Sequence, residues 1–183
     1  MRTVELPVFT RRVFLDRTLQ ALGAAAVLPL PAWADDAGES GARTSAVPAL
    51  EFLTATEYVT LDAVGDTIIP AGGAFELGAR EAGLARRIDR YLTKWDPMVA
   101  TGFRGALAFF EQKAPQLAGK AAPFSALSEA DRTAVADAML KAGGLPAGVL
   151  LAAKFVCVSH FYTMDRTWKF TGYDGPMLLE DAR

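Results

Sequence analysis

The sequence of 183 residues contains a single cysteine, Cys157, and a single histidine, His160. One cysteine excludes a disulfide within the chain and also a C-x-x-C-H haem-attachment site, which needs two cysteines. Basic residues are not in excess either, because 19 Lys and Arg stand against 21 Asp and Glu and leave a net charge of −2. This balance argues against nucleic acid as a partner, since phosphate binding relies on clustered Lys and Arg.

Strand-like patterns are also scarce in this sequence. No segment alternates apolar and polar residues convincingly, and no tight-turn dipeptide joins two strand-like runs. Hydrophobic residues make up 51% of the chain, which is enough to bury one sizeable core. We therefore expect an all-α protein, a compact bundle of about five helices, with an irregular C-terminal tail that begins near Asp165.

The N-terminal segment has the features of an export signal. Residues 10–15 read TRRVFL, and the positions that match the twin-arginine consensus are Arg11, Arg12, Phe14 and Leu15. A weakly hydrophobic stretch over residues 18–30 follows, and it is shorter than the roughly 20 apolar residues that a membrane-spanning helix needs. The small residues Ala32 and Ala34 then provide a cleavage site. We expect residues 1–34 to be a twin-arginine signal peptide.

This leader has consequences for compartment and for domain boundaries. The twin-arginine translocase would carry the chain, already folded, to the periplasm. Residues 35–50 are small and polar, which predicts a flexible linker, and residues 51–183 are expected to form the helical domain. Two alternatives for the leader are an ordinary amphipathic helix and an uncleaved membrane anchor.

Apolar residues at helical spacing predict five helices after the linker. Thr54 or Thr56 is expected to cap the first helix, and Ser128 with Asp131 fits a capping box for the fourth. Trp95 is expected to continue the apolar stripe of the second helix. The expected helices cover residues 54–70, 84–95, 96–115, 128–143 and 147–162.

Cys157 and His160 are the side chains best suited to metal binding or catalysis. Three positions apart on the last expected helix, they share roughly one face, where they could bind a metal with Asp165 or Asp174 as further ligands. They could also act as a nucleophile and its base. Two ligands do not close a metal site, however, and a place in an apolar stripe favours a buried thiol beside a hydrogen-bonded imidazole.

Two further patterns are weaker. Four carboxylates are expected on solvated helix faces, where none is paired as acid and base: Glu81, Asp89, Glu111 and Asp131. The glycines between residues 72 and 83 match neither phosphate-loop fingerprint. They indicate only a loop that separates two helices.

Several short motifs, weak one by one, become specific through their order and spacing. Residues 61–70 read LDAVGDTIIP, residues 78–83 read GAREAG, residues 124–128 read FSALS and residues 172–176 read GYDGP. Together with the leader, they resemble the small subunit (subunit 3, or gamma) of gluconate 2-dehydrogenase-type complexes. The resemblance extends over nearly the whole chain.

The resemblance implies a membrane-associated periplasmic dehydrogenase of several subunits. A large flavoprotein of the glucose-methanol-choline oxidoreductase type would hold FAD and oxidise a sugar or sugar acid, and a cytochrome c subunit with haem c would pass the electrons to quinone. The small subunit would hold no cofactor and no catalytic residue. It would supply the export signal for the flavoprotein and stabilise it.

The resemblance does not identify the residues that contact the flavoprotein. Tryptophan and tyrosine are favoured interface anchors, so we expect contacts at the end of the first helix and in the tail, through Asp66, Pro70, Trp168, Tyr173 and Pro176. The alternative is that these residues only fix the tail onto the chain's own helices. Two competing functions are a free-standing periplasmic enzyme or metal protein that uses Cys157 and His160, and a small-ligand binding module, for which the sequence offers no convergent polar set.

Overall fold

The computed structural model describes residues 49–73 and 76–174, and within them every regular element is helical. The elements are α2 (Ala55–Ile68), α3 (Ala79–Ala82), α4 (Leu84–Leu92), α5 (Pro97–Gln112), α6 (Ala114–Leu117), a 3-10 turn η2 (Phe124–Ala126), α7 (Glu129–Ala142), α8 (Gly144–Tyr162) and α9 (Asp165–Thr171). The all-α expectation is confirmed for these residues. The leader and most of the linker lie outside the described residues.

The five longest helices correspond to the five expected from the sequence, and α3, α6 and α9 are short additions. Three boundaries differ from those expected. The second helix ends at Leu92, so Trp95 lies beyond it, and the tail is not irregular from Asp165 because α9 begins there. The last long helix also starts at Gly144 rather than near residue 147, since Pro146 falls in its first turn, where proline is tolerated.

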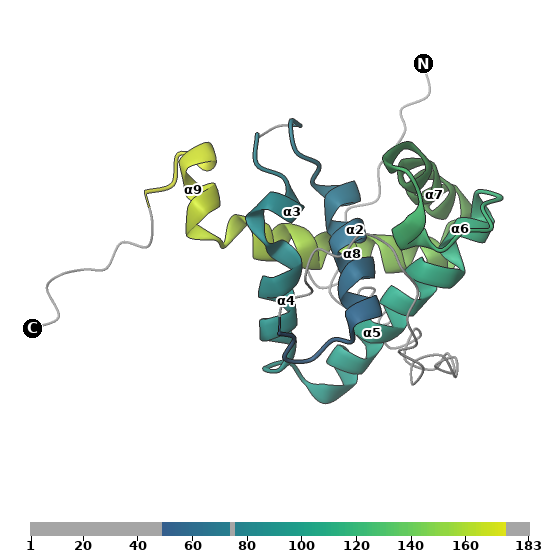
Figure 1. Cartoon of the computed structure of the whole chain (residues 1–183), viewed down its shortest axis with the longest axis horizontal. Coiled ribbons are helices and arrows are strands. Elements are labelled where there is room, and N and C mark those ends of the chain that lie inside the picture. The colour runs from purple at the N-terminus through teal and green to yellow at the C-terminus, as the bar shows by residue number, and fades with distance from the viewer. Residues whose placement is uncertain (1–48, 74–75, 175–183) are drawn as a thin grey trace, which may run out of the picture.

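The long helix α8 is the centre of the fold. It packs against α2, α3, α4, α5, α7 and α9, and Figure 1 shows it running behind α2 and α4, with α7 near one end and α9 at the other. By length and composition alone the 19-residue α8 is apolar enough to cross a membrane, with a mean hydropathy of 1.5 over an 18-residue window. In this fold 39% of that window is buried against other helices, while Leu151 and Phe155 are exposed.

One hydrophobic core joins the five long helices. Each contributes at least one side chain that is no more than 1% exposed, namely Leu61, Ile88, Phe103, Val135 and Phe161. Burying one such side chain stabilises a fold by about 1.5–3 kcal/mol. The single core agrees with a single helical unit over the described residues.

The helix starts follow the predicted capping chemistry. Thr54 Oγ1 accepts the backbone N–H of Glu57 at 3.3 Å, while a Glu57 carboxylate oxygen accepts the N–H of Thr54 at 2.9 Å. Ser128 Oγ accepts the N–H of Asp131 at 3.2 Å, but the Asp131 carboxylate accepts the Ser128 hydroxyl at 2.9 Å instead of its backbone N–H, so only half of the predicted capping box forms. These side chains satisfy donors that have no partner within the first turn of a helix.

Candidate functional site

Cys157 and His160 both lie on α8, but their surroundings differ. The Cys157 side chain is fully buried, and burial raises the pKa of its thiol to about 12. A thiol of that pKa stays protonated at neutral pH, whereas a nucleophilic cysteine needs a thiolate. The structure therefore gives no support to the nucleophile hypothesis.

His160 is half-buried among aromatic rings. Its ring centroid lies 5.0 Å from that of Tyr91 and 6.1 Å from that of Trp95, onto which it stacks. Burial lowers the pKa of His160, and the nearby Arg87 lowers it further. Within residues 49–73 and 76–174, no group of three or more His, Cys, Asp and Glu side chains is placed to hold a metal ion. The described residues thus offer no further ligands to complete a site with Cys157 and His160.

Two carboxylates expected on solvated faces are buried, and that expectation was wrong. Asp89 of α4 is 1% exposed, and its two oxygens accept the backbone N–H groups of Glu51 at 2.8 Å, Phe52 at 3.1 Å and Leu53 at 2.8 Å. A buried carboxylate costs free energy unless it is hydrogen-bonded. Asp89 therefore fixes the segment that leads into α2.

Glu111 of α5 plays a similar part at the other end of the fold. It is 7% exposed, and its oxygens accept the Thr60 hydroxyl at 3.0 Å, the Ser125 hydroxyl at 2.6 Å and the Ser125 N–H at 3.1 Å. These bonds tie α5 to α2 and to η2. The oxygens of both buried carboxylates thus accept structural hydrogen bonds from their own chain and do not face a substrate.

Asp66, one of the expected interface residues, belongs to a chain of ion pairs. Its Oδ2 lies 3.2 Å from Arg80 Nη2 and 3.0 Å from Arg132 Nη2, and Arg80 Nε also reaches Asp62 at 2.8 Å. Burial raises the pKa of Asp62, which Arg80 opposes. The network joins α2 to α3 and α7, and Pro70, at the end of α2, is exposed.

Trp168 and Tyr173, the other expected anchors, form an aromatic pair at the end of the described chain. Their ring centroids are 5.2 Å apart in an edge-to-face arrangement, and Tyr173 is 50% exposed. The buried Thr167 hydroxyl donates to the carbonyls of Phe161 and Met164, which holds α9 against the end of α8. Pro176 lies outside the described residues.

Sequence reasoning missed a basic cleft between α4 and α9. The cleft has a volume of about 640 Å³, and its charged lining consists of Glu51 and the five basic residues Arg86, Arg87, Arg90, Lys94 and Arg166. Tyr91 also lines it, and the guanidinium of Arg87 and the ammonium of Lys94 lie 5.1 and 5.2 Å from the centre of the Tyr91 ring. The signal was present in the sequence, since the basic residues of α4 recur at helical spacing, but their partner face on α9 was expected to be irregular.

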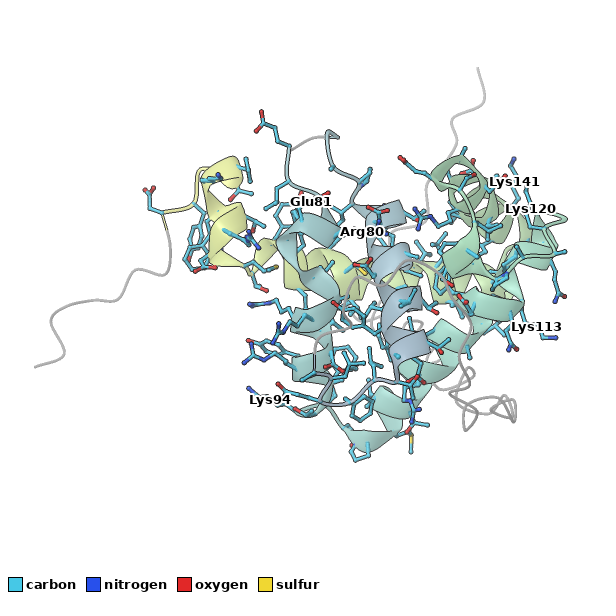
Figure 2. All side chains as sticks on the ribbon, in the orientation of Figure 1. Arg80, Glu81, Lys94, Lys113, Lys120 and Lys141 are labelled. Atoms are coloured by element: carbon cyan, nitrogen blue, oxygen red, sulfur yellow. The ribbon has the colours of Figure 1, made fainter. Side chains whose placement is uncertain are left out.

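Hydrogen bonds position two of these arginines. Arg87 Nη2 donates to the Thr163 carbonyl at 3.1 Å, and Arg166 Nη1 donates to the Ala82 carbonyl at 3.0 Å. The two bonds connect α4 and α3 to the segment that carries α9. In Figure 2, Lys94 marks the lower end of the cleft, on the opposite side of the molecule from Lys113, Lys120 and Lys141.

Comparison with known proteins identifies one family. A family model described as "Gluconate 2-dehydrogenase subunit 3" matches residues 55–173, from the first residue of α2 to two residues beyond α9. Searches of curated proteins and of solved structures gave no significant match. The matched region includes the buried carboxylates, the Asp66 network, all five basic residues of the cleft and the Trp168–Tyr173 pair.

Proposed function

Because this chain belongs to the gluconate 2-dehydrogenase subunit 3 family, we propose that it is the small, non-catalytic accessory subunit of a periplasmic FAD-dependent dehydrogenase. The enzyme oxidises a sugar or sugar acid and is associated with the membrane through its other subunits. The observation that carries this proposal is the family match over residues 55–173.

The buried polar groups of the chain support a non-catalytic role. Asp89 and Glu111 hold backbone and hydroxyl groups of their own chain, and the Cys157 thiol is fully buried and protonated at neutral pH. Catalytic acids, bases and nucleophiles instead need access to a substrate and a pKa suited to proton transfer. In the proposed complex, FAD belongs to the large subunit and haem c to a cytochrome subunit.

The leader supports a second role, in export. Arg11, Arg12, Phe14 and Leu15 match the signal that the twin-arginine translocase recognises, and this route carries folded proteins. A flavoprotein that folds around FAD in the cytoplasm and binds this chain can then cross the membrane with it. The accessory subunit thus supplies the export signal for the flavoprotein and stabilises it.

Contacts with the flavoprotein are proposed at the two predicted places. Pro70 is exposed, and the exposed Tyr173 packs against Trp168, so both places present apolar surface next to polar groups. Asp66 contributes indirectly, because its ion pairs with Arg80 and Arg132 hold the end of α2 in position. Aromatic anchors with a polar rim are typical of protein interfaces.

The export role is tested by replacing the twin arginines in the full-length chain. Arg11→Lys with Arg12→Lys keeps the charge, and we expect it to leave both this chain and the FAD-dependent dehydrogenase activity in the cytoplasm. Arg2→Lys with Arg17→Lys is the matched control, since it makes the same change elsewhere in the leader. Dehydrogenase activity that still reaches the periplasm in the twin-lysine strain would contradict the proposal.

A further inference from the structure

The basic cleft lies on the solvent-facing side of α4. Positions 83, 86, 87, 90, 91 and 94 all line it, and this spacing follows one face of an α-helix. The opposite face of α4 is buried through Leu84, Ile88 and Leu92. All charged residues that positions 83–94 contribute to the cleft are basic, and α9 adds Arg166.

Most of this positive charge is not neutralised within the cleft. Five basic residues and one carboxylate line it, which leaves an excess of four positive charges. The carboxylate, Glu51, pairs with Arg90 at 3.2 Å. Arg86 and Lys94 are exposed and form no ion pair with another residue in the described part of the chain. The cleft is therefore ready to accept an anionic group.

The arrangement of charge also works against the isolated helix. Arg86 and Arg90 are four residues apart on α4, and like charges at this spacing repel one another and destabilise a helix. An acidic partner would relieve this repulsion. The basic residues of α4 thus favour the binding of an acidic partner more than they favour the stability of the helix.

The shape of the site and the overall charge narrow the class of partner. The chain as a whole carries a net charge of −2, so the residues outside the cleft are net acidic, which disfavours a long polyanion. A membrane presents a flat sheet of headgroups, whereas these cations surround a recess of about 640 Å³. Guanidinium groups bind carboxylates through paired hydrogen bonds, and Arg and Tyr are enriched at protein interfaces. A short acidic stretch of a protein fits these conditions.

We propose that the basic cleft binds an acidic segment of the partner dehydrogenase subunit, whose Asp or Glu side chains pair with Arg86, Arg90 and Lys94. The assignment rests on the proposed function, from which it takes the partner. Arg166 joins the cleft to the helix that carries Trp168, so the acidic segment and an aromatic contact would lie on neighbouring parts of one interface.

Charge reversal in the cleft tests this assignment. The full-length tagged chain is isolated from its native cells, and the amount of co-purified flavoprotein is measured for each variant. We expect Arg86→Glu with Lys94→Glu to recover about tenfold less flavoprotein than the wild type, because attraction becomes repulsion. Raising the salt concentration should release flavoprotein from the wild type, since salt screens exposed charges.

The matched control is Lys113→Glu with Lys141→Glu. It changes the net charge by the same amount, and both lysines are exposed on the opposite side of the molecule from Lys94 (Figure 2). This control should recover flavoprotein within about twofold of the wild type, as expected for residues outside an interface. Thermal unfolding followed by circular dichroism checks that each variant folds. If the reversed cleft variant does not fold, Arg86→Gln with Lys94→Gln takes its place, with a smaller loss in the same direction.

Other outcomes separate this inference from the proposed function. Equal recovery by the cleft variant and the control would overturn the cleft assignment and leave the accessory role intact. A wild-type chain that recovers no flavoprotein would contradict the accessory role and the cleft assignment together. Binding to phosphatidylglycerol vesicles that the cleft variant loses, with flavoprotein recovery unchanged, would assign the cleft to the membrane instead.

Discussion

At the scale of single residues, the described structure depends on buried carboxylates that act as connectors. Asp89 alone accepts three backbone N–H groups from residues 51–53, and Glu111 links hydroxyl and backbone donors from two other elements. Hydrogen bonds to a charged group are roughly twice as strong as neutral ones, so each connector contributes more than the same number of neutral hydrogen bonds would. These residues are the points at which small changes should have large effects on stability.

Replacing Asp89 by asparagine tests its role as a connector. Asp89→Asn keeps the size of the side chain but removes the charge and one acceptor, and it sets an amide donor against backbone donors. We expect the free energy of unfolding to fall by about 2–3 kcal/mol, which corresponds to a drop in Tm of roughly 5–10 °C for a chain of this length. Thermal unfolding measures the change. Asp137→Asn, at an exposed position of α7, is the control, and an equal loss in both variants would contradict the role given to Asp89.

His160 predicts a pH dependence of stability. Burial, with a smaller effect from Arg87, lowers the pKa of His160 in the folded chain, so the folded state favours the neutral imidazole. The unfolded chain takes up this proton near pH 6.5. Unfolding therefore binds a proton, and the contribution to stability is present above that pH and is lost as the pH falls below it.

The matching experiment compares Tm at pH 7.5 and pH 5.5. We expect the Tm of the wild type to fall further from pH 7.5 to pH 5.5 than the Tm of His160→Phe. This variant keeps an aromatic ring beside Tyr91 and Trp95 but cannot titrate. Asp62 and the other carboxylates are common to both proteins, so their effects cancel in the comparison. The same loss of Tm in both proteins would show that His160 titrates normally.

The sequence could not reveal the connectors because their partners are far away along the chain. Asp89 binds residues 36–38 positions earlier, and Glu111 binds Thr60, which is 51 positions away. A polar residue on an amphipathic helix is usually solvated, and periodicity alone does not show which polar residue turns inward. The burial of Cys157, in contrast, follows from its place in an apolar stripe and was predicted.

At the scale of helices and loops, the helix starts were the most predictable features. Thr54 and Ser128 cap α2 and α7 through donors only three residues away, so the whole interaction is contained in a short stretch of sequence. The short helix α9 was missed for the opposite reason. Its seven residues are held by the buried Thr167 and closed by Gly172 in a left-handed conformation, and so short a helix gives little periodicity.

The loop between α2 and α3 depends on a close approach at Gly78. A Cβ atom at this position would lie 2.5 Å from the backbone nitrogen of Ala71 and 2.7 Å from a carboxylate oxygen of Glu81. Gly78→Ala should therefore force the loop away from α3 and lower the free energy of unfolding by about 1–3 kcal/mol, as other overpacked sites do.

A matched substitution lies in the same loop. At Gly73 the nearest atom to an added Cβ would be the Pro70 carbonyl oxygen at 3.5 Å, which is ordinary contact, so Gly73→Ala should change stability by less than about 0.5 kcal/mol. Urea unfolding of both variants measures the difference. Equal effects of the two substitutions would show that the loop moves freely to accommodate a methyl group.

At the scale of the whole molecule, the helices divide the surface into regions with different tasks. The central α8 contacts six other helices, and the family model matches residues 55–173, which include all of them. The end of this helical fold formed by α4 and α9 carries the basic cleft and the Trp168–Tyr173 pair. An accessory subunit needs a stable body with a recognisable contact face, and this arrangement provides both.

The family was recognisable from the sequence because four short motifs occur in a specific order, in the second half of α2, at α3, at η2 and after α9. The basic cleft was not, since it requires α9 to lie beside α3 and α4, where Arg166 donates to the Ala82 carbonyl of α3. A contact across 84 positions of the sequence has no local signature. Interfaces built from two distant elements therefore need the fold before they can be described.

Co-purification of a flavoprotein with this chain is the decisive test of the proposed accessory role. The tagged full-length chain is isolated from the periplasm and membranes of its native cells, and the absorption spectrum of the purified material is recorded. We predict a stoichiometric flavoprotein with flavin absorption, with or without the bands of haem c, and sugar or sugar-acid oxidation with an artificial electron acceptor. A colourless chain that purifies alone would contradict the accessory-subunit account.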